Sequence, residues 1–209
     1  EIGDIIYERS LDRHFEVHNI IVDYQSYNAN VGNGQLNCPP TELIDLDLDP
    51  GLYECWNIAV KESSSDIITN WNPDDRRTVD SIKSLANTLI LLNDYDLVYG
   101  LTLITKNKNE KTQNCESQSI FSAEPFSIKS LFFNNSPHCM PVWRKNIHEK
   151  SGYFDNSYVS AGDGDMWLRA AINGSKFFFL KKIIGSYYES DSTVSRNKDK
   201  LHFLVNEVY

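Results

Sequence analysis

The sequence lacks the features that mark membrane, repeat and low-complexity proteins. No apolar run approaches the roughly 20 residues that a membrane-spanning helix needs, and runs such as 177–180 have the length of a strand. Internal repeats, low-complexity tracts and a signal-peptide pattern are also missing. The sequence starts at Glu1 rather than Met, which leaves room for residues upstream.

Positive charge and metal-binding patterns are scarce as well. The chain has 20 Lys and Arg against 29 Asp and Glu, a net charge of −9, which argues against a general nucleic-acid binder because such proteins need a basic surface. There is no glycine-rich phosphate loop and no GxGxxG motif. The cysteines form no CxxC pair, so a zinc site is not expected and we predict reduced, structural thiols at Cys38, Cys55, Cys115 and Cys139.

What the sequence does contain is an alternation of helical and strand-like segments. Helical patterns lie at 1–15, 51–62, 78–92, 144–150, 164–173 and 198–208. Strand-like patterns lie at 18–22, 43–48, 66–71, 95–104, 120–127, 138–143, 176–180 and 183–189, with polar loops at 24–40 and 106–119. With 209 residues, this order predicts one α/β domain whose mixed, mostly parallel sheet has helices on both faces.

The first candidate site follows the strand at 66–71, where Asp74 and Asp75 stand side by side. In sheets of this kind, ligands bind beyond the carboxyl ends of the strands. Paired carboxylates there can hold Mg²⁺ or Mn²⁺, with substrate phosphates completing the coordination. The alternative is structural: Pro73 makes a turn and Asp75 caps the helix at 78–92.

The second candidate site opens the helix at 164–173. Asp163 could be a general base at the lip of a cleft, or it could simply cap this helix. Asp165 lies in the first turn, where carboxylates are common without any function. A third, weaker candidate is Asp23, which either accepts a hydrogen bond from a nucleoside or only terminates its strand.

Four segments, in order and with matching spacing, resemble motifs of the large inverting family of GT-A glycosyltransferases (glycosyltransferase family 2-like), which contains many bacterial-type polysaccharide synthases. They are 51–59 (GLYECWNIA), 66–76 (DIITNWNPDDR), 142–155 (from VWRK to GYFD) and 161–169 (AGDGDMWLR). The resemblance spans roughly residues 18–196. It implies a nucleotide-sugar half at about 1–105 and an acceptor and catalytic half at about 106–209 within a single domain, 1–209.

The resemblance also implies roles for individual residues. Asp75 would bind the metal, Mn²⁺ or Mg²⁺, and Asp163 would be the catalytic base. Residues implied to bind the nucleotide sugar are Asp23, Ser26, Asn57, Asp74 and Arg76. Residues implied to contact the acceptor are Trp143, Asp165 and Trp167, together with the loop at 106–119.

The chain departs from the family pattern in five places. The apolar strand that normally opens the fold has no counterpart before residue 1; it is either truncated or supplied by another segment. Gly162 stands where relatives carry Glu. Substitutions also occur at Trp56, Ser65 and Ser190.

The resemblance implies a metal-dependent, inverting glycosyltransferase that uses a nucleotide-diphosphate sugar, with UDP favoured, and a glycan or lipid-linked acceptor. We expect a cytoplasmic location, with peripheral association at the membrane's cytoplasmic face left open. The alternative is a non-catalytic GT-A-like domain that binds nucleotide sugar or glycan, or acts as a scaffold in a larger protein. A nucleotidyltransferase would need a glycine- and lysine-rich phosphate loop near the start, and none is visible.

Overall fold

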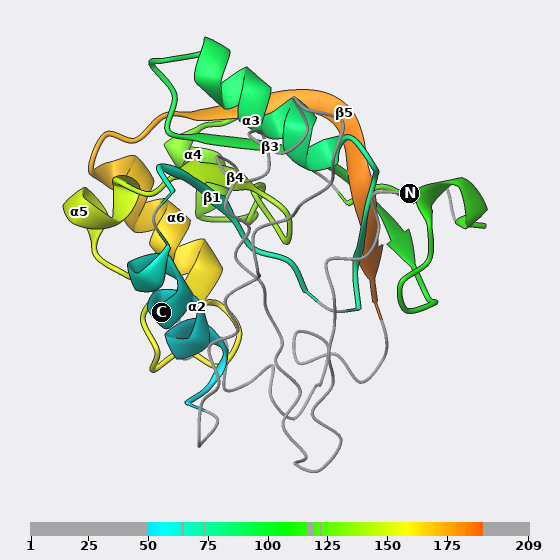
Figure 1. Ribbon diagram of the computed structural model, residues 1–209, viewed down its shortest axis with the longest axis horizontal. Helices are drawn as coiled ribbons and strands as arrows, with labels where there is room; N and C mark the ends of the chain where they lie inside the picture. The colour runs from blue at the N-terminus through cyan, green and yellow to red at the C-terminus, as the bar shows by residue number, and fades with distance from the viewer. Residues whose placement is uncertain (1–49, 64, 73, 117–118, 122, 190–209) are drawn as a thin grey trace, which may run out of the picture.

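The computed structural model describes residues 50–63, 65–72, 74–116, 119–121 and 123–189 (Figure 1). The elements predicted within 1–49 and 190–209 lie outside these residues. So do Asp23 and Ser26, which were predicted to bind the nucleotide sugar, and Cys38.

A five-stranded sheet forms the centre of the described part, in the order β1-β4-β3-β5-β2. The pairing of β3 with β5 is parallel, and the β1–β4, β3–β4 and β2–β5 pairings are antiparallel. Consequently β1, β3 and β5 run in the same direction and end at one edge, which we call the carboxyl edge. The predicted mixed α/β fold is confirmed, with strands β1 (Ile67–Thr69), β2 (Arg76–Arg77), β3 (Leu97–Thr105), β4 (Val142–Arg144) and β5 (Phe177–Tyr188).

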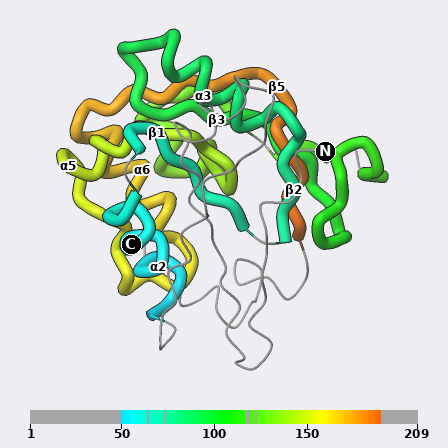
Figure 2. The backbone as a smooth tube through the Cα atoms, viewed as in Figure 1, coloured from blue at the N-terminus to red at the C-terminus, as the bar shows by residue number. Residues whose placement is uncertain are grey.

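The strand β5 is continuous over 12 residues, so the prediction of two strands at 176–180 and 183–189 is wrong. The break in the apolar pattern at Lys181 marks a solvent-exposed position within the strand rather than a turn. The register between β5 and β3 shifts between Tyr99 and Thr102. Gly100 permits this close approach, because a Cβ there would lie only 2.7 Å from Cγ2 of Ile184. Figure 1 shows β5 as a long, bent ribbon, and Figure 2 shows β2 beside its final part.

Helices cover both faces of the sheet, as predicted. One face is covered by α3, which buries Leu85, Ala86 and Leu89, three of the residues whose spacing predicted an apolar helix face. The opposite face is covered by α2, α5 and α6, with the short α4 packed alongside α6. The described helices are α2 (Leu52–Glu62), α3 (Ser81–Leu91), α4 (Ile128–Leu131), α5 (Ile147–Ser151), α6 (Gly162–Ile172) and the 3-10 turn η1 (Thr112–Asn114).

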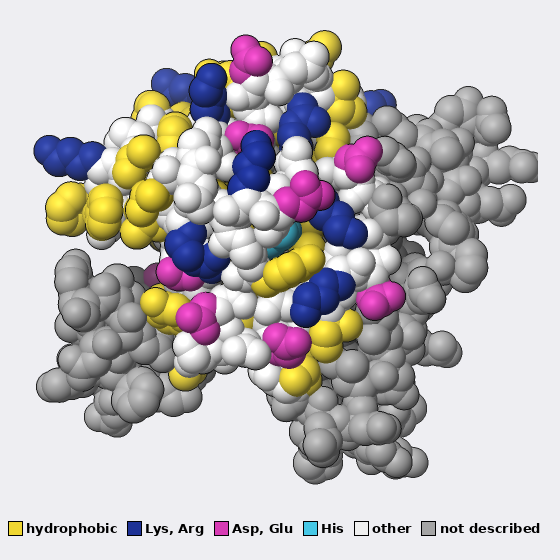
Figure 3. Space-filling view, turned by 90° about the vertical axis from the view of Figure 1, so that its left-hand side faces the viewer, with side chains coloured by type: hydrophobic (Ala, Val, Ile, Leu, Met, Phe, Trp, Pro, Cys, Tyr) yellow, Lys and Arg dark blue, Asp and Glu magenta, His cyan; other side chains and the backbone are white. Residues whose placement is uncertain are grey.

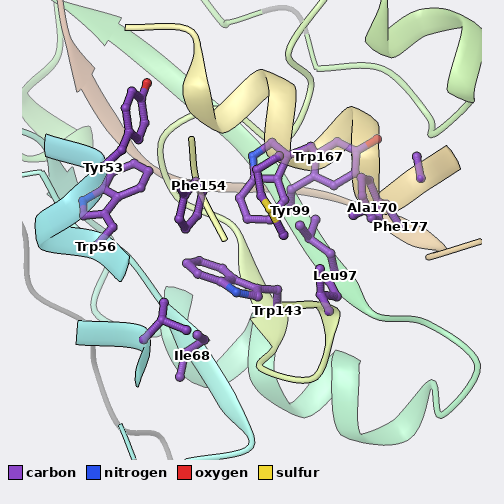
Figure 4. Close-up of a cluster of buried hydrophobic side chains, with 14 residues drawn as sticks. Tyr53, Trp56, Ile68, Leu97, Tyr99, Trp143, Phe154, Trp167, Ala170 and Phe177 are labelled. Carbon is purple, nitrogen blue, oxygen red and sulfur yellow. The ribbon is translucent and has the colours of Figure 1, made fainter. Parts of the chain in front are cut away.

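The two sides of the sheet have different cores. Alternate side chains of a strand point to opposite faces, so Tyr99 and Val98 enter different clusters. The first cluster, which we call the aromatic layer, is shown in Figure 4 and includes Tyr53, Trp56, Tyr99, Trp143, Phe154, Trp167 and Phe177. The second, which we call the aliphatic layer, includes Ile67, Leu85, Leu89, Val98, Cys139, Met140, Val142 and Ile184.

The segment between β3 and β4 differs most from the sequence expectation. Among the residues of 120–127 that the structure describes, Ile120 forms an isolated bridge with Leu103 and no strand is present. Further along, Ser127 caps α4 by accepting a hydrogen bond from the Ser130 amide at 3.0 Å. The strand expected at 138–143 begins only at Val142, and His138, with a φ of 49°, is itself incompatible with an extended strand.

Candidate functional site

The carboxylate of Asp75 lies in the turn between β1 and β2, at the carboxyl edge. Its side chain is buried, with 1% of the residue exposed. Oδ1 accepts a hydrogen bond from the backbone N–H of Tyr188 at 2.8 Å, and Oδ2 accepts one from Nδ2 of Asn72 at 2.9 Å. The structural alternative, a cap for the next helix, is wrong, because α3 begins at Ser81 with Asp80 at the N-cap position.

Burial makes the negative charge of Asp75 unfavourable and raises the pKa of its carboxyl to about 7. The neighbouring charge of Asp74 acts in the same direction, whereas the hydrogen bonds from Tyr188, Asn72 and the Cys139 thiol oppose the shift. The turn therefore holds a desolvated carboxylate whose ionised form a nearby cation would stabilise.

A buried arginine lies close to this carboxylate. Nη2 of Arg77 donates to Oγ1 of Thr69 at 2.6 Å and to the carbonyl oxygen of Asn70 at 2.9 Å. Burial lowers the pKa of Arg77 to about 10, and the charge of Asp75 favours its ionised form. These bonds join β2 to the end of β1 and so fix the shape of the turn that carries Asp75.

Asp74 and Arg76 flank Asp75 in the same turn. Both are partly exposed, and the backbone carbonyl of Asp74 accepts a hydrogen bond from the N–H of Asn109 at 2.8 Å. This bond ties the 106–119 loop to the turn. The donor-binding roles of Asp74 and Arg76 stay predictions, and the structure brings both residues next to the predicted metal ligand.

Asp163 is the second residue of α6. Its Oδ2 accepts a hydrogen bond from Nδ2 of Asn135 at 2.6 Å, and its Oδ1 accepts one from the Tyr53 hydroxyl at 3.4 Å. The residue at the N-cap position is Ala161, so Asp163 is not the N-cap residue of this helix. Burial raises the pKa of Asp163, and the hydrogen bonds from Asn135 and from backbone N–H groups of the first helical turn oppose the shift.

The partners of Asp163 could not be read from the sequence. Asn135 lies 28 residues away and Tyr53 lies 110 residues away, on a different helix. No local motif connects either of them to Asp163. The only signal in the sequence was that Tyr53 falls within the family-like segment at 51–59.

Position 162, where the family resemblance implies an acid, has little room for a side chain. A Cβ at Gly162 would lie 2.8–2.9 Å from three carbons of the Tyr53 ring. The ring occupies the space that a side chain at this position would need. The same ring carries the hydroxyl that reaches Asp163, so the departure from the family pattern is linked to how Asp163 is held.

Asp165, predicted to contact an acceptor, forms a local ion pair in the structure, and its acceptor role stays a prediction. Its Oδ2 lies 2.7 Å from Nη2 of Arg169, four residues further along α6. Arg169 also donates to the backbone carbonyls of Tyr153, at 2.9 Å, and of Ser151. Asp165 thus helps to hold the end of α5 and the following segment against α6.

Three other predicted ligand contacts are structural. The amide of Asn57 is buried and exchanges hydrogen bonds with Phe154, donating to its carbonyl at 2.8 Å and accepting from its N–H at 2.9 Å. A second Nδ2 contact, to Glu54 at 3.3 Å, leaves the Asn57 amide with no free hydrogen for a donor sugar. Trp143 and Trp167 are 0% and 1% exposed and meet edge to face in the aromatic layer, where an acceptor has no access to them (Figure 4).

Asp75 and Asp163 lie toward the same side of the molecule. Asp75 follows β1 at the carboxyl edge, and α6 runs back from that edge before the chain enters β5. In Figure 1 the first turn of α6 and the end of β5 both lie toward the lower part of the view. Within the described part of the chain, no group of three His, Cys, Asp or Glu residues is arranged to hold a metal ion.

Surface charge, helix composition and the cysteines were also considered in the sequence predictions. Figure 3 shows basic and acidic side chains interspersed on one face, without a continuous basic stripe on that face. No helix among the described residues has the length and apolarity needed to cross a membrane. Cys115 and Cys139 are buried free thiols, as predicted.

Comparisons with known proteins agree with this architecture. No family model matches the chain. A curated protein of Bacillus subtilis (strain 168), described as "Uncharacterized glycosyltransferase YwdF", is 26% identical over 133 residues, which cover 63% of this chain and 48% of that protein. The chain thus spans about half the length of this curated relative.

Solved structures of S. aureus TarS have a similar fold. The structure of TarS 1-349 matches with a TM-score of 0.55 and 15% identity, covering 80% of this chain and 48% of that one. TarS 1-349 in complex with UDP matches with a TM-score of 0.53 and 18% identity, covering 70% of this chain and 43% of that one. Together with the curated relative, these matches confirm the resemblance seen in the four sequence segments: the chain has the fold of a GT-A-type glycosyltransferase.

Proposed function

We propose that the chain is a metal-dependent, inverting glycosyltransferase that moves a sugar from a nucleotide-diphosphate sugar to a glycan or lipid-linked acceptor. The observation that carries the proposal is the environment of Asp163. A carboxylate whose pKa is raised by burial, and whose two oxygens are oriented by Asn135 and Tyr53, has the properties of a general base. The similarity to known glycosyltransferases supports the same conclusion.

In this reaction Asp163 receives the proton of the acceptor hydroxyl. The hydroxyl oxygen forms a bond to the anomeric carbon of the donor sugar while the bond from that carbon to the diphosphate breaks. The nucleoside diphosphate leaves with the electron pair of the broken bond, and attack from the opposite side inverts the anomeric centre. The hydrogen bonds from Asn135 and Tyr53 keep the carboxylate of Asp163 aimed during the transfer.

The residues at the carboxyl edge fit a divalent cation. Asp75 is a desolvated carboxylate beside the second carboxylate of Asp74, and Mn²⁺ and Mg²⁺ prefer oxygen ligands of this kind. Because such ions are often bound by one or two carboxylates plus substrate phosphates, the donor diphosphate would complete the coordination. Bound there, the cation would neutralise charge that develops on the leaving diphosphate.

The proposal also names the donor nucleotide and the cellular compartment. A complex of TarS with UDP is among the structures of similar fold, which supports UDP as the nucleotide. We place the reaction in the cytoplasm, including the cytoplasmic face of the membrane. Cys115 and Cys139 are buried free thiols, as is usual in a reducing compartment.

A second function is favoured by one observation. Asp75 is almost closed to solvent, and both of its oxygens already accept hydrogen bonds. If those bonds persist when a donor is present, the chain would be a non-catalytic GT-A-like domain that binds nucleotide sugar or glycan, or a scaffold within a longer protein.

A donor screen separates the two functions. The protein is incubated with UDP-, GDP- and dTDP-sugars, each with Mn²⁺ and with EDTA, while nucleotide release and the melting temperature are measured. Metal-dependent release from one donor is the expected result and identifies the sugar. Stabilisation by a donor without release would favour the nucleotide-sugar-binding domain. No response to any donor would contradict transfer by this chain and would favour the glycan-binding or scaffold form of the second function.

A further inference from the structure

Two adjacent phenylalanines are exposed immediately after α4. Phe132 is 55% exposed and Phe133 is 81% exposed, and Ile128 on the same short helix is 43% exposed. Single exposed apolar residues are common on protein surfaces, but two consecutive phenylalanines, both exposed, present an unusual amount of aromatic surface to water. This surface, which we call the Phe132–Phe133 platform, has no role in the core of the described part.

The platform lies close to the candidate base, Asp163, through Asn135. Two residues beyond Phe133, Asn135 donates its 2.6 Å hydrogen bond to Asp163. The Asn135 side chain also lies 3.9 Å from the position of a Cβ on Gly164. The chain between Phe133 and Asn135 is therefore too short for the platform to lie far from the carboxylate.

The helix that precedes the platform is anchored to the rest of the domain. Leu131, the last residue of α4, packs against the aromatic layer, and α4 lies against α6. At the start of α4, Ser127 accepts a hydrogen bond from the Ser130 amide at 3.0 Å and so caps the N-terminus of the helix. The two exposed rings consequently project from an anchored element rather than from a free loop.

We infer that the Phe132–Phe133 platform is an acceptor subsite on which a pyranose ring of a glycan stacks. This inference rests on the proposed function, since it places the acceptor beside Asp163. The axial C–H groups of one face of a pyranose are weakly positive, and the face of a phenyl ring is negative, so the two attract as they bury apolar surface. The hydroxyls at the ring edge stay in reach of water and of polar groups near Asp163.

Charge favours a glycan over a membrane surface as the occupant. Between 123 and 141 the sequence contains one basic residue, Lys129, and one acidic residue, Glu124, and the whole chain carries a net charge of −9. Attraction to anionic lipids needs several Lys or Arg residues together. A neutral sugar ring needs none, and it can present a hydroxyl to Asp163 while its face covers the platform.

The test compares ring-retaining and ring-removing variants of the full 209-residue chain. The variants are Phe132→Leu/Phe133→Leu, which keeps apolar bulk without rings, and Phe132→Tyr/Phe133→Tyr, which keeps the rings. The matched control is Leu91→Ala, an 80% exposed apolar residue at the end of α3 on the opposite face of the sheet. Melting temperatures show whether each variant is folded, which is expected because all three positions are exposed.

The probes are short soluble oligosaccharides of glucose, mannose and N-acetylglucosamine, with binding measured by calorimetry and donor hydrolysis measured separately. We expect one series to bind, the double leucine variant to weaken that binding about tenfold, and the tyrosine variant and the control to bind normally. Donor hydrolysis without acceptor should not change in any of these variants.

The outcomes separate this inference from the proposed function. A protein that hydrolyses a donor but binds no oligosaccharide, or binds it equally well without the rings, overturns the platform and leaves transfer intact. A protein that binds an oligosaccharide through the rings but hydrolyses no donor supports the platform as a glycan site and overturns transfer. Association with anionic vesicles that the leucine variant retains would show a membrane contact and overturn the glycan assignment.

Discussion

Asp75 is buried and Asp163 is half-buried, and desolvation raises the pKa of both carboxyls, yet they are held by different kinds of partner. Asp163 stands at the aromatic layer and is oriented by side chains from distant parts of the chain, Asn135 and Tyr53. Asp75 stands beside the aliphatic layer and is oriented by a backbone N–H of β5 and by Asn72, three residues away.

Because their partners differ, the two carboxylates should respond differently to substitutions of neighbouring residues. Backbone and local partners persist through most substitutions, so the carboxylate of Asp75 should keep its position in most variants. Its negative charge remains unfavourable because it is buried. The geometry of Asp163 depends on particular side chains and should be adjustable by single substitutions. Three predictions on catalysis and donor binding follow this contrast, from the largest expected effect to the smallest, and a fourth concerns stability in acid.

The largest effect is expected for Asp163→Asn. Loss of the base should lower kcat about 1,000-fold, because general base catalysis contributes on the order of 10²–10⁴. Donor affinity, measured by calorimetry with UDP and Mn²⁺, should stay within about twofold, because Asp163 acts on the acceptor's proton and not on the nucleotide. The matched control is Asp165→Asn on the same helical turn, and equal losses of kcat in both variants would contradict the role of Asp163.

The next effect is expected for Asp75→Asn, which removes the charge and keeps an oxygen to accept from the Tyr188 N–H. Mn²⁺-dependent donor affinity should fall roughly 100-fold, because changes even to the partners of metal ligands cost 10–100-fold. Affinity in EDTA should not change. Asp80→Asn, at an exposed ion pair with Lys182, serves as the control, and an unaltered Mn²⁺ dependence in Asp75→Asn would disprove the metal assignment.

A smaller effect is expected for Asn135→Ala, which removes the 2.6 Å hydrogen bond to Asp163. That bond favours the ionised carboxylate and lowers its pKa, so its loss should raise the pKa and move the acidic limb of the pH–rate profile to higher pH. We expect kcat to fall about tenfold with donor KM unchanged.

Tyr53→Phe gives the comparison for this prediction. Its hydroxyl lies 3.4 Å from Asp163, longer than an ordinary O–H···O bond, so a lesser shift in the same direction is expected. A pH profile that does not move in Asn135→Ala would show that Asn135 has only a structural role.

The last prediction concerns the stability of the aromatic layer in acid. The Trp143 indole donates to Nε2 of His148 at 3.1 Å, so this nitrogen is an acceptor and the ring is neutral, with its other nitrogen facing the Gly152 carbonyl at 3.0 Å. Burial lowers the pKa of His148 to about 4. The unfolded chain therefore takes up this proton first as the pH falls.

The contribution of His148 to stability is present above its ordinary pKa of about 6.5 and is lost as the pH falls toward 4. His148→Gln should flatten the pH dependence of the unfolding free energy over this range by up to about 1.4 kcal/mol per pH unit. Chemical denaturation of both proteins between pH 7 and pH 4 measures the difference. Parallel curves would contradict the neutral, buried state of His148.

Sequence patterns were sufficient for the elements whose apolar spacing is regular. The helices α2, α3 and α6 and the strand β3 lie close to the predicted segments, since each helix buries one face in the way its period indicates and β3 is an apolar run buried on both faces. The patterns failed where a local exception interrupts the period, as at Lys181 within β5 and at His138 before β4.

For the candidate site, the motifs located the carboxylates but not their surroundings. A motif gives the type and position of a residue, but not where its side chain points. For this reason Asn57, Trp143 and Trp167 were interpreted as ligand contacts although the structure buries them. The partners Asn135 and Tyr53 come close to Asp163 only through tertiary packing of α2, α4 and α6.

The contact between the Tyr53 ring and Gly162 makes these two positions a coupled pair for protein engineering. An acidic residue introduced at 162 alone would collide with the ring, so it should destabilise the start of α6 before it could contribute chemistry. A smaller residue introduced at 53 alone would open a cavity and remove one of the hydrogen bonds to Asp163. An acidic residue at 162 is therefore expected to need a compensating substitution at 53, and a library that varies one position at a time would miss this combination.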